Sequence, residues 1–206
     1  VRKAPLLHAP IHALARLITR TAWGERFVRD VLNAETLSDA QYRAWSARND
    51  ALTDADRAAI AAHIAAMAAP PTISVVMPAY ATPAPLIRAA IASVKAQLYP
   101  HWELCIADDG SPGEAFWRVL EDEAAREPRL RIVRRPANGH ISAASNSAVA
   151  LATAPFVALL DHDDLLAPSA LAEMALAIDA HPDAAILYSD EDKLDESGER
   201  IEPYFK

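Results

Sequence analysis

Three carboxylates within four residues, Asp161-His162-Asp163-Asp164, could hold a metal ion. The apolar run 156–160 before them follows a proline and is typical of a strand buried on both faces. Ligands of open α/β sheets bind at the carboxyl ends of such strands. Carboxylates this close repel one another unless a cation lies among them, and Mg²⁺ or Mn²⁺ held by one or two carboxylates takes its other ligands from phosphates and water. The pattern predicts a metal-assisted diphosphate site, with a solvated acidic turn that caps the next helix as the alternative.

Two further polar segments follow apolar runs. Asp108-Asp109-Gly110-Ser111 comes after residues 102–107, and a carboxylate there could accept a hydrogen bond from the imide N–H of uracil or thymine. Pro78-Ala79-Tyr80 comes after residues 73–77, and Tyr80 could lie against a base. An ordinary Asx turn and a plain loop are the alternatives.

Two other segments carry weaker signals. Asn138-Gly139-His140 enters a helical pattern, and backbone N–H groups at a helix N-terminus favour anions, so a phosphate could rest there. Simple capping by Asn138 or Ser142 is the alternative. Residues 189–193 add three carboxylates that could support the metal site, or form a solvated turn, but their spacing is not that of a calcium loop.

The elements that must position these residues alternate between strands and helices. Alternation of this kind implies βαβ units and a mainly parallel sheet, with the loops after strands one, two and four at one edge. The predicted strands are 73–77, 102–107, 130–133, 156–160 and 184–188, and the predicted helices between and after them are 84–98, 116–126, 141–152 and 170–180.

Residues 1–71 are predicted to form a helical extension, because Pro70 and Pro71 end an alanine-rich helix that begins after Thr53. The apolar residues of 4–20 recur at helical spacing beside basic ones. Such a helix could lie on an anionic membrane or pack on protein, and the spacing does not decide between them.

Composition excludes several classes of protein. Residues 161–206 carry 3 basic and 13 acidic side chains, which argues against a nucleic-acid-binding surface. The motifs of dinucleotide-binding domains, P-loop NTPases, α/β-hydrolases and zinc proteases are missing. The single cysteine, Cys105, lies in an apolar run and is predicted to be buried and unreactive.

Taken together, the segments resemble family 2 glycosyltransferases of the GT-A fold. The resemblance rests on residues 74–80, 107–111, 138–146 and 159–164, and residues 188–206 are similar to a branch that builds bacterial surface polysaccharides, including rhamnosyltransferase-like enzymes. It implies an α/β, Rossmann-like, mainly parallel sheet over 72–206 that binds a nucleoside-diphosphate sugar, preceded by the helical extension 1–71.

The resemblance also assigns roles to residues. Asp161 and Asp163 would form the DxD motif that holds Mn²⁺ or Mg²⁺ against the donor diphosphate, with Asp163 as the direct ligand. Six other residues would bind the donor: Pro78, Ala79, Tyr80, Asp108, Asp109 and Gly139. Two positions depart from the family pattern, since Ala81 replaces an Asn after the Tyr and Ser145 replaces an Arg before Asn146.

The implied reaction is an inverting, metal-dependent transfer of a sugar from a UDP or dTDP donor to a hydroxyl of a glycan or lipid-linked glycan. The resemblance places the catalytic base and most of the acceptor site beyond Lys206. The chain is predicted to be cytoplasmic, and residues 1–20 could make peripheral contact with the inner face of the plasma membrane.

Two other functions are compatible with the residues. An aspartate-based phosphohydrolase could form a phosphoaspartate at Asp161, although Leu165 stands where such enzymes usually have Thr or Val. A non-catalytic module could bind a nucleotide or a partner.

Overall fold

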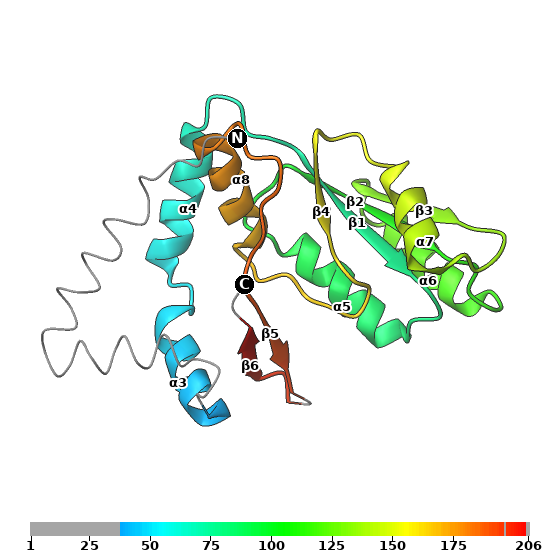
Figure 1. Cartoon of the computed structure of the whole chain (residues 1–206), viewed down its shortest axis with the longest axis horizontal. Helices are drawn as coiled ribbons and strands as arrows, with labels where there is room; N and C mark the ends of the chain where they lie inside the picture. Colours follow the sequence, from blue (N-terminus) through cyan, green and yellow to red (C-terminus); the bar gives the residue numbers. More distant parts are fainter. Residues whose placement is uncertain (1–37, 196, 205–206) are drawn as a thin grey trace, which may run out of the picture. The chain divides into compact units, whose positions relative to one another are not determined.

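A computed structural model describes residues 38–195 and 197–204 (Figure 1). The described residues divide into two compact units, one over Thr53–Leu187 and the other made of 38–52 together with the described part of 188–204. The predicted helix over 4–20 lies outside the described residues. Helix α4 (Asp54–Ala66) belongs to the unit that contains the sheet, and its Ile64 packs into the core of that unit. A domain boundary between residues 71 and 72 stays a prediction.

The larger unit is an α/β fold whose four strands are parallel and lie in the order β3-β2-β1-β4. The strands are β1 (Ile73–Ala79), β2 (Trp102–Asp108), β3 (Leu130–Arg134) and β4 (Phe156–Leu159), and the helices after α4 are α5 (Ala84–Lys95), α6 (Ala115–Ala124), α7 (His140–Val149) and α8 (Ala170–Ala180). The predicted α/β class and the first four strands are thereby confirmed.

Alternation along the central strands divides the core into two layers. Val75 and Met77 of β1 share one cluster with Ile91 of α5 and Leu120 of α6, which also takes in residues of α4 and α8. Val76 and Cys105 face the other layer, where they cluster with Ala148 of α7. Helices therefore cover both faces of the sheet, and β1 and β2 are buried along their whole length (Figure 1).

A buried carboxylate ties the amino ends of the strands together. Glu103 of β2 accepts hydrogen bonds from Ser74 Oγ (2.6 Å), from the backbone N–H of Thr153 (2.5 Å) and from the backbone N–H of Ala154 (3.2 Å), and it pairs with Arg131 Nε at 3.2 Å. Burial alone would raise the pKa of Glu103, but the hydrogen bonds and Arg131 lower it overall. Glu103 thus holds the turn that leads into β4.

Two predictions about strands are wrong. β4 is not buried on both faces, because its residues alternate between partly buried and exposed and its Leu159 is 76% exposed. Among the described residues, β4 pairs only with β1 and forms an edge of the sheet. The segment 184–188 forms no strand, and its Ile186 is 83% exposed. An apolar run has strand propensity, but pairing also needs a partner edge, which the sequence of the run does not encode.

The smaller unit contains α3 (Asp39–Asn49) and an antiparallel hairpin of β5 (Glu191–Leu194) and β6 (Arg200–Tyr204). Ser38 and Gln41 form the capping box that starts α3. The Tyr42 hydroxyl donates to Asp192 Oδ2 at 2.7 Å, and Arg200 bonds to the same carboxylate. Asp192 lies in the acidic segment 189–193, and these contacts give it a structural role in joining α3 to the hairpin.

None of the helices in residues 38–195 and 197–204 is long and apolar enough to span a membrane.

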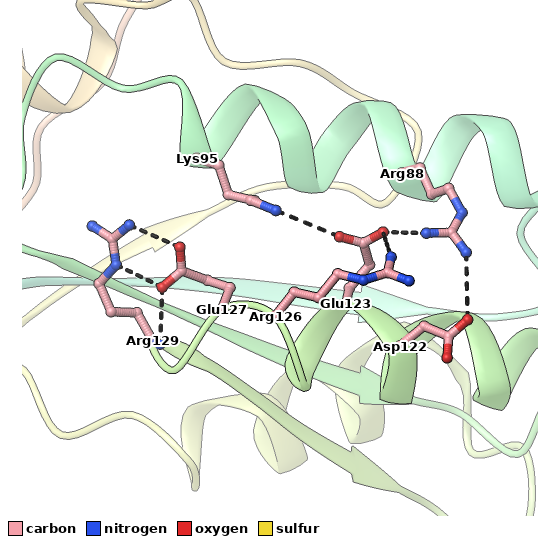
Figure 2. A network of polar contacts seen from close by, with 7 residues as sticks. All are labelled: Arg88, Lys95, Asp122, Glu123, Arg126, Glu127 and Arg129. Atoms are coloured by element: carbon pink, nitrogen blue, oxygen red, sulfur yellow. Dashed lines mark hydrogen bonds and ion pairs between the residues drawn. The ribbon is translucent and has the colours of Figure 1, made fainter.

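A polar network joins α5 to α6 (Figure 2). Glu123, whose side chain is 11% exposed, pairs with Arg88, with Lys95 at 3.6 Å and with Arg126 at 4.0 Å. Glu127 pairs with Arg129, whose Nη2 lies 2.9 Å from Glu127 Oε2. The network fixes the chain at the turn that leads into β3.

The Glu127→Gln variant should lose about 1–2 kcal/mol of unfolding free energy at pH 7. Hydrogen bonds from Arg129 lower the pKa of Glu127 to about 2 from its ordinary 4.5. Because the folded-state pKa is depressed, this stability is complete above pH 4.5 and disappears as the pH falls toward 2. The expected loss is smaller than the free energy that corresponds to the whole pKa shift, because the Arg129 side chain is partly exposed to water. Urea unfolding at several pH values measures it.

The control is Asp122→Asn, since Asp122 is 61% exposed and lies 3.9 Å from Arg88. This variant should stay within about 0.5 kcal/mol of the wild type at every pH. Equal pH dependence in Glu127→Gln and the wild type would contradict the assignment.

Candidate functional site

The carboxyl ends of the parallel strands bring the predicted site residues to one edge of the sheet. β1 lies between β2 and β4, so the loop that contains Tyr80 is flanked by the loops that contain Asp109 and Asp161. The Leu160 N–H donates to Val76 O at 3.1 Å and extends the pairing to the residue before Asp161. Asp109 and Asp163 therefore belong to the same edge of the sheet.

The end of β1 contributes one exposed side chain. Pro78 and Ala79 lie within β1 and are buried, whereas Tyr80 is 46% exposed and free to meet a ligand. Ala81 has a positive φ of 48°, and its N–H donates to Ser111 Oγ at 2.7 Å. This bond joins the loop after β1 to the loop after β2.

Asp108 is fully buried and holds the loop after β2. Its Oδ1 accepts the Ser111 N–H at 2.9 Å, and its Oδ2 lies 3.4 Å from Arg134 Nε. Arg134 also contacts Glu114 and the Gly113 carbonyl, so it is committed to the same loop. These contacts show that Asp108 stabilises the loop after β2. The predicted contact between Asp108 and a sugar-nucleotide donor stays a prediction.

Asp109 bridges the loops after β2 and β3. Both of its oxygens accept the Gly139 N–H, at 3.0 and 3.1 Å, and Oδ1 lies 2.8 Å from Arg135 Nε. Only 3% of the residue is exposed. Gly139 thus contributes a backbone donor to this edge, and the donor is directed at Asp109.

A polar cavity of about 350 Å³ opens beside these contacts. It is lined by Gly110, Ser111, Glu114, Arg134, Arg135 and Pro136. Arg134 and Arg135 were not among the predicted site residues. A signal for them was present in the sequence. Two arginines follow the predicted strand 130–133, and two aspartates follow the predicted strand 102–107, so the opposite charges come to the same edge if the two strands are parallel neighbours.

The loop after β4 presents its carboxylates to solvent. Asp161 is exposed and the Asp163 side chain is 56% exposed, while His162 Nδ1 is buried and lies 3.7 Å from Asp163 Oδ1. The Asp164 N–H donates to Asp161 O at 3.2 Å and forms a turn. These hard oxygen donors fit a cation that takes its remaining ligands from a diphosphate and water. In the part of the chain that the structure describes, no three His, Cys, Asp or Glu side chains gather into a complete site.

Comparison with known proteins decides the family. The family described as Glycosyl transferase family 2 matches residues 74–204. The chain belongs to glycosyl transferase family 2. The match spans β1 except its first residue, the other three strands of the sheet, and the loops that follow the four strands.

Two curated relatives extend the family 2 match over almost the whole chain. The uncharacterized protein y4gI of Sinorhizobium fredii is 42% identical over 215 residues, which cover 98% of this chain and 23% of the relative. The O-antigen biosynthesis protein RfbC of Myxococcus xanthus is 36% identical over 208 residues, which cover 92% of this chain and 16% of the relative. The chain therefore spans less than a quarter of the length of these relatives.

A solved structure supports the fold expected of a family 2 protein. The mannosyltransferase PcManGT from Pyrobaculum calidifontis, in complex with GDP-Man and Mn²⁺, is 26% identical with a TM-score of 0.50. The likeness covers 58% of this chain and 34% of that one. Together with the parallel sheet, it confirms the predicted GT-A class.

Gly110→Ala should lower the unfolding free energy by about 2–4 kcal/mol, through a strained backbone and a steric clash. Gly110 has φ +71°, and an added Cβ would lie 2.7 Å from the Ala137 carbonyl carbon. Gly113→Ala is the matched control, because its φ is +72° but open space surrounds the added atom. That variant should lose only about 1–2 kcal/mol. Thermal unfolding of both measures the difference, and equal losses would show that the contact with residue 137 is unimportant.

Ala81→Gly should raise the unfolding free energy by about 0.5–1 kcal/mol, because glycine adopts a positive φ without the cost that an L side chain bears. Ala92→Gly, at an exposed position of α5, should instead lower it by about 1 kcal/mol. Chemical denaturation distinguishes the two signs, and destabilisation by both substitutions would rule out strain at Ala81.

Proposed function

We propose that the chain binds a nucleoside-diphosphate sugar at the carboxyl edge of its sheet, as the donor part of a glycosyltransferase that builds a surface polysaccharide. The observation that carries the proposal is that a family 2 chain places Tyr80, Asp109 and Asp161 on adjacent loops of one edge. The name of RfbC supports a role in O-antigen synthesis, and the complex of PcManGT supports a sugar nucleotide with Mn²⁺.

The nucleoside would lie across the ends of β1 and β2. Tyr80 offers an exposed aromatic ring for contact with a base or ribose, beside the backbone of Pro78 and Ala79. Asp109 has lone pairs beyond those that Gly139 and Arg135 use, and these could accept an N–H from the base. A UDP or dTDP donor presents such an imide.

Asp161 and Asp163 would hold Mn²⁺ or Mg²⁺ together with the donor diphosphate. When bound, the cation would stabilise negative charge on the leaving diphosphate. The described carboxylates fit this role because they are solvent-accessible and follow β4 directly.

The transfer itself would be a single displacement with inversion. The acceptor hydroxyl oxygen forms a bond to the anomeric carbon while the bond from that carbon to the diphosphate breaks. A base takes the hydroxyl proton, and the nucleoside diphosphate leaves. The acceptor would be a glycan or lipid-linked glycan. The residues at this edge are assigned to the donor, and none is assigned the role of the base.

The family match favours a transferase over the aspartate-based phosphohydrolase, because it covers the two loops after β1 and β2 that a phosphoaspartate mechanism does not require. The membrane contact through residues 1–20 stays a prediction, since these residues lie outside the described part of the chain. The cytoplasmic location is likewise a prediction.

Calorimetry with UDP and dTDP, each with and without Mn²⁺, tests the proposal. Wild type should bind one of them at least about tenfold more tightly with Mn²⁺, and Asp163→Asn should abolish that gain while leaving metal-free binding unchanged. Asp179→Asn, at an exposed residue of α8, is the control and should behave as wild type. Folded wild-type protein that binds no sugar nucleotide would refute the proposal, and binding without a metal effect would refute the metal role alone.

A further inference from the structure

Arg135 connects Asp109 to helix α7. Its Nε lies 2.8 Å from Asp109 Oδ1, and its Nη1 donates to the Ala143 carbonyl at 2.7 Å and to Ser147 Oγ at 2.8 Å. The Arg135 side chain is 23% exposed and that of Asp109 is 4% exposed. The guanidinium is therefore held at both ends, by an ion pair with Asp109 and by two hydrogen bonds to α7.

Gly139 completes the arrangement from the other side. Its N–H reaches both oxygens of Asp109, and a Cβ at this position would lie 2.4 Å from Arg135 Nη2. The missing side chain leaves room for the guanidinium. Asp109 is thus contacted from two directions, by the Gly139 N–H and by the Arg135 guanidinium, and the two contacts together restrict the rotation of its carboxylate.

We propose that Arg135 is a positioning residue that fixes the orientation of the Asp109 carboxylate and thereby determines how well the donor site discriminates between bases. A carboxylate free to rotate accepts an N–H from many directions, whereas a fixed one favours the base whose edge matches its remaining lone pairs. This inference rests on the proposed function and adds to it the origin of base specificity. Arg135 contacts Asp109 and lines the adjoining cavity, so it acts on the base through the carboxylate.

Arg131, within β3, offers a matched control for Arg135, which lies just after the end of that strand. Its Nε lies 3.2 Å from Glu103 Oε2 on β2, and its Nη1 donates to the Leu151 carbonyl at 3.2 Å. Arg131 and Arg135 thus make the same two kinds of contact. Each pairs with a carboxylate on β2 or just after it, and each donates to a backbone carbonyl in α7 or just after it. Arg131 differs in facing the amino end of the sheet, away from the donor site.

The experiment measures Kd by calorimetry for UDP, GDP and pyrophosphate, each with Mn²⁺, in the whole chain. In Arg135→Gln, the ratio of the two nucleotide Kd values should move about tenfold toward one, while the Kd for pyrophosphate changes less than about twofold. Arg131→Gln should leave the ratio unchanged. Ser147→Ala, which removes one acceptor of the guanidinium but keeps the ion pair, should move the ratio about threefold.

Each outcome bears on the inference. An unchanged ratio in folded Arg135→Gln, or an equal loss of affinity for pyrophosphate and nucleotide, would overturn it while the proposed function stands. If Arg135→Gln fails to fold, Ser147→Ala decides, and an unchanged ratio there overturns the inference. Wild type that binds neither nucleotide would overturn the proposed function and this inference together.

Discussion

The pairing of β1 with a parallel strand on each side is the constraint on which the candidate site depends. β1 forms hydrogen bonds with β2 along its whole length and with β4 along its first half, so three loops leave the sheet at one edge. The shorter pairing is the more vulnerable, because β4 has four residues and one solvent-exposed face. Glu103 compensates at the other end of the sheet by binding the backbone that enters β4. A carboxylate far from the ligand edge thus contributes to placing the carboxylates that could hold a cation.

The two adjacent aspartates at the end of β2 make different contacts. Asp108 turns its contacts inward, to Ser111 and Arg134, and stabilises the loop. Asp109 reaches across to the loop after β3, where Gly139 and Arg135 hold it. Each aspartate lies beside one of two consecutive arginines, Arg134 at the end of β3 and Arg135 just after it, so both buried carboxylates are paired with a cation. In the loop after β4, Asp161 and Asp163 are instead exposed to solvent, which suits a cation and a diphosphate.

Local sequence patterns predicted the central elements well because periodicity and burial agree there. Helix α8 begins and ends where the alanine-rich pattern does, and the cap at Thr53 was recognisable from its side chain. Strand edges were harder: an apolar run does not reveal which neighbour it will pair with, so 184–188 was assigned as a strand and the β5–β6 hairpin was missed. The burial of Asp108 and the roles of Arg134 and Arg135 depend on contacts between loops distant in sequence. No spacing rule within one segment could predict them, although the resemblance to a family located the edge where they lie.

Cys105 has a practical consequence. It is the only cysteine in these 206 residues, it lies fully buried on β2 where it clusters with Val76 and Ala148, and burial raises the pKa of its thiol to about 11. Thiolate is the form that alkylating reagents attack, so the native chain should resist maleimides while it stays folded. A cysteine introduced at an exposed position such as Leu159 would then carry a fluorophore or spin label alone. Spectroscopic study of this edge of the sheet would need no prior removal of the native thiol.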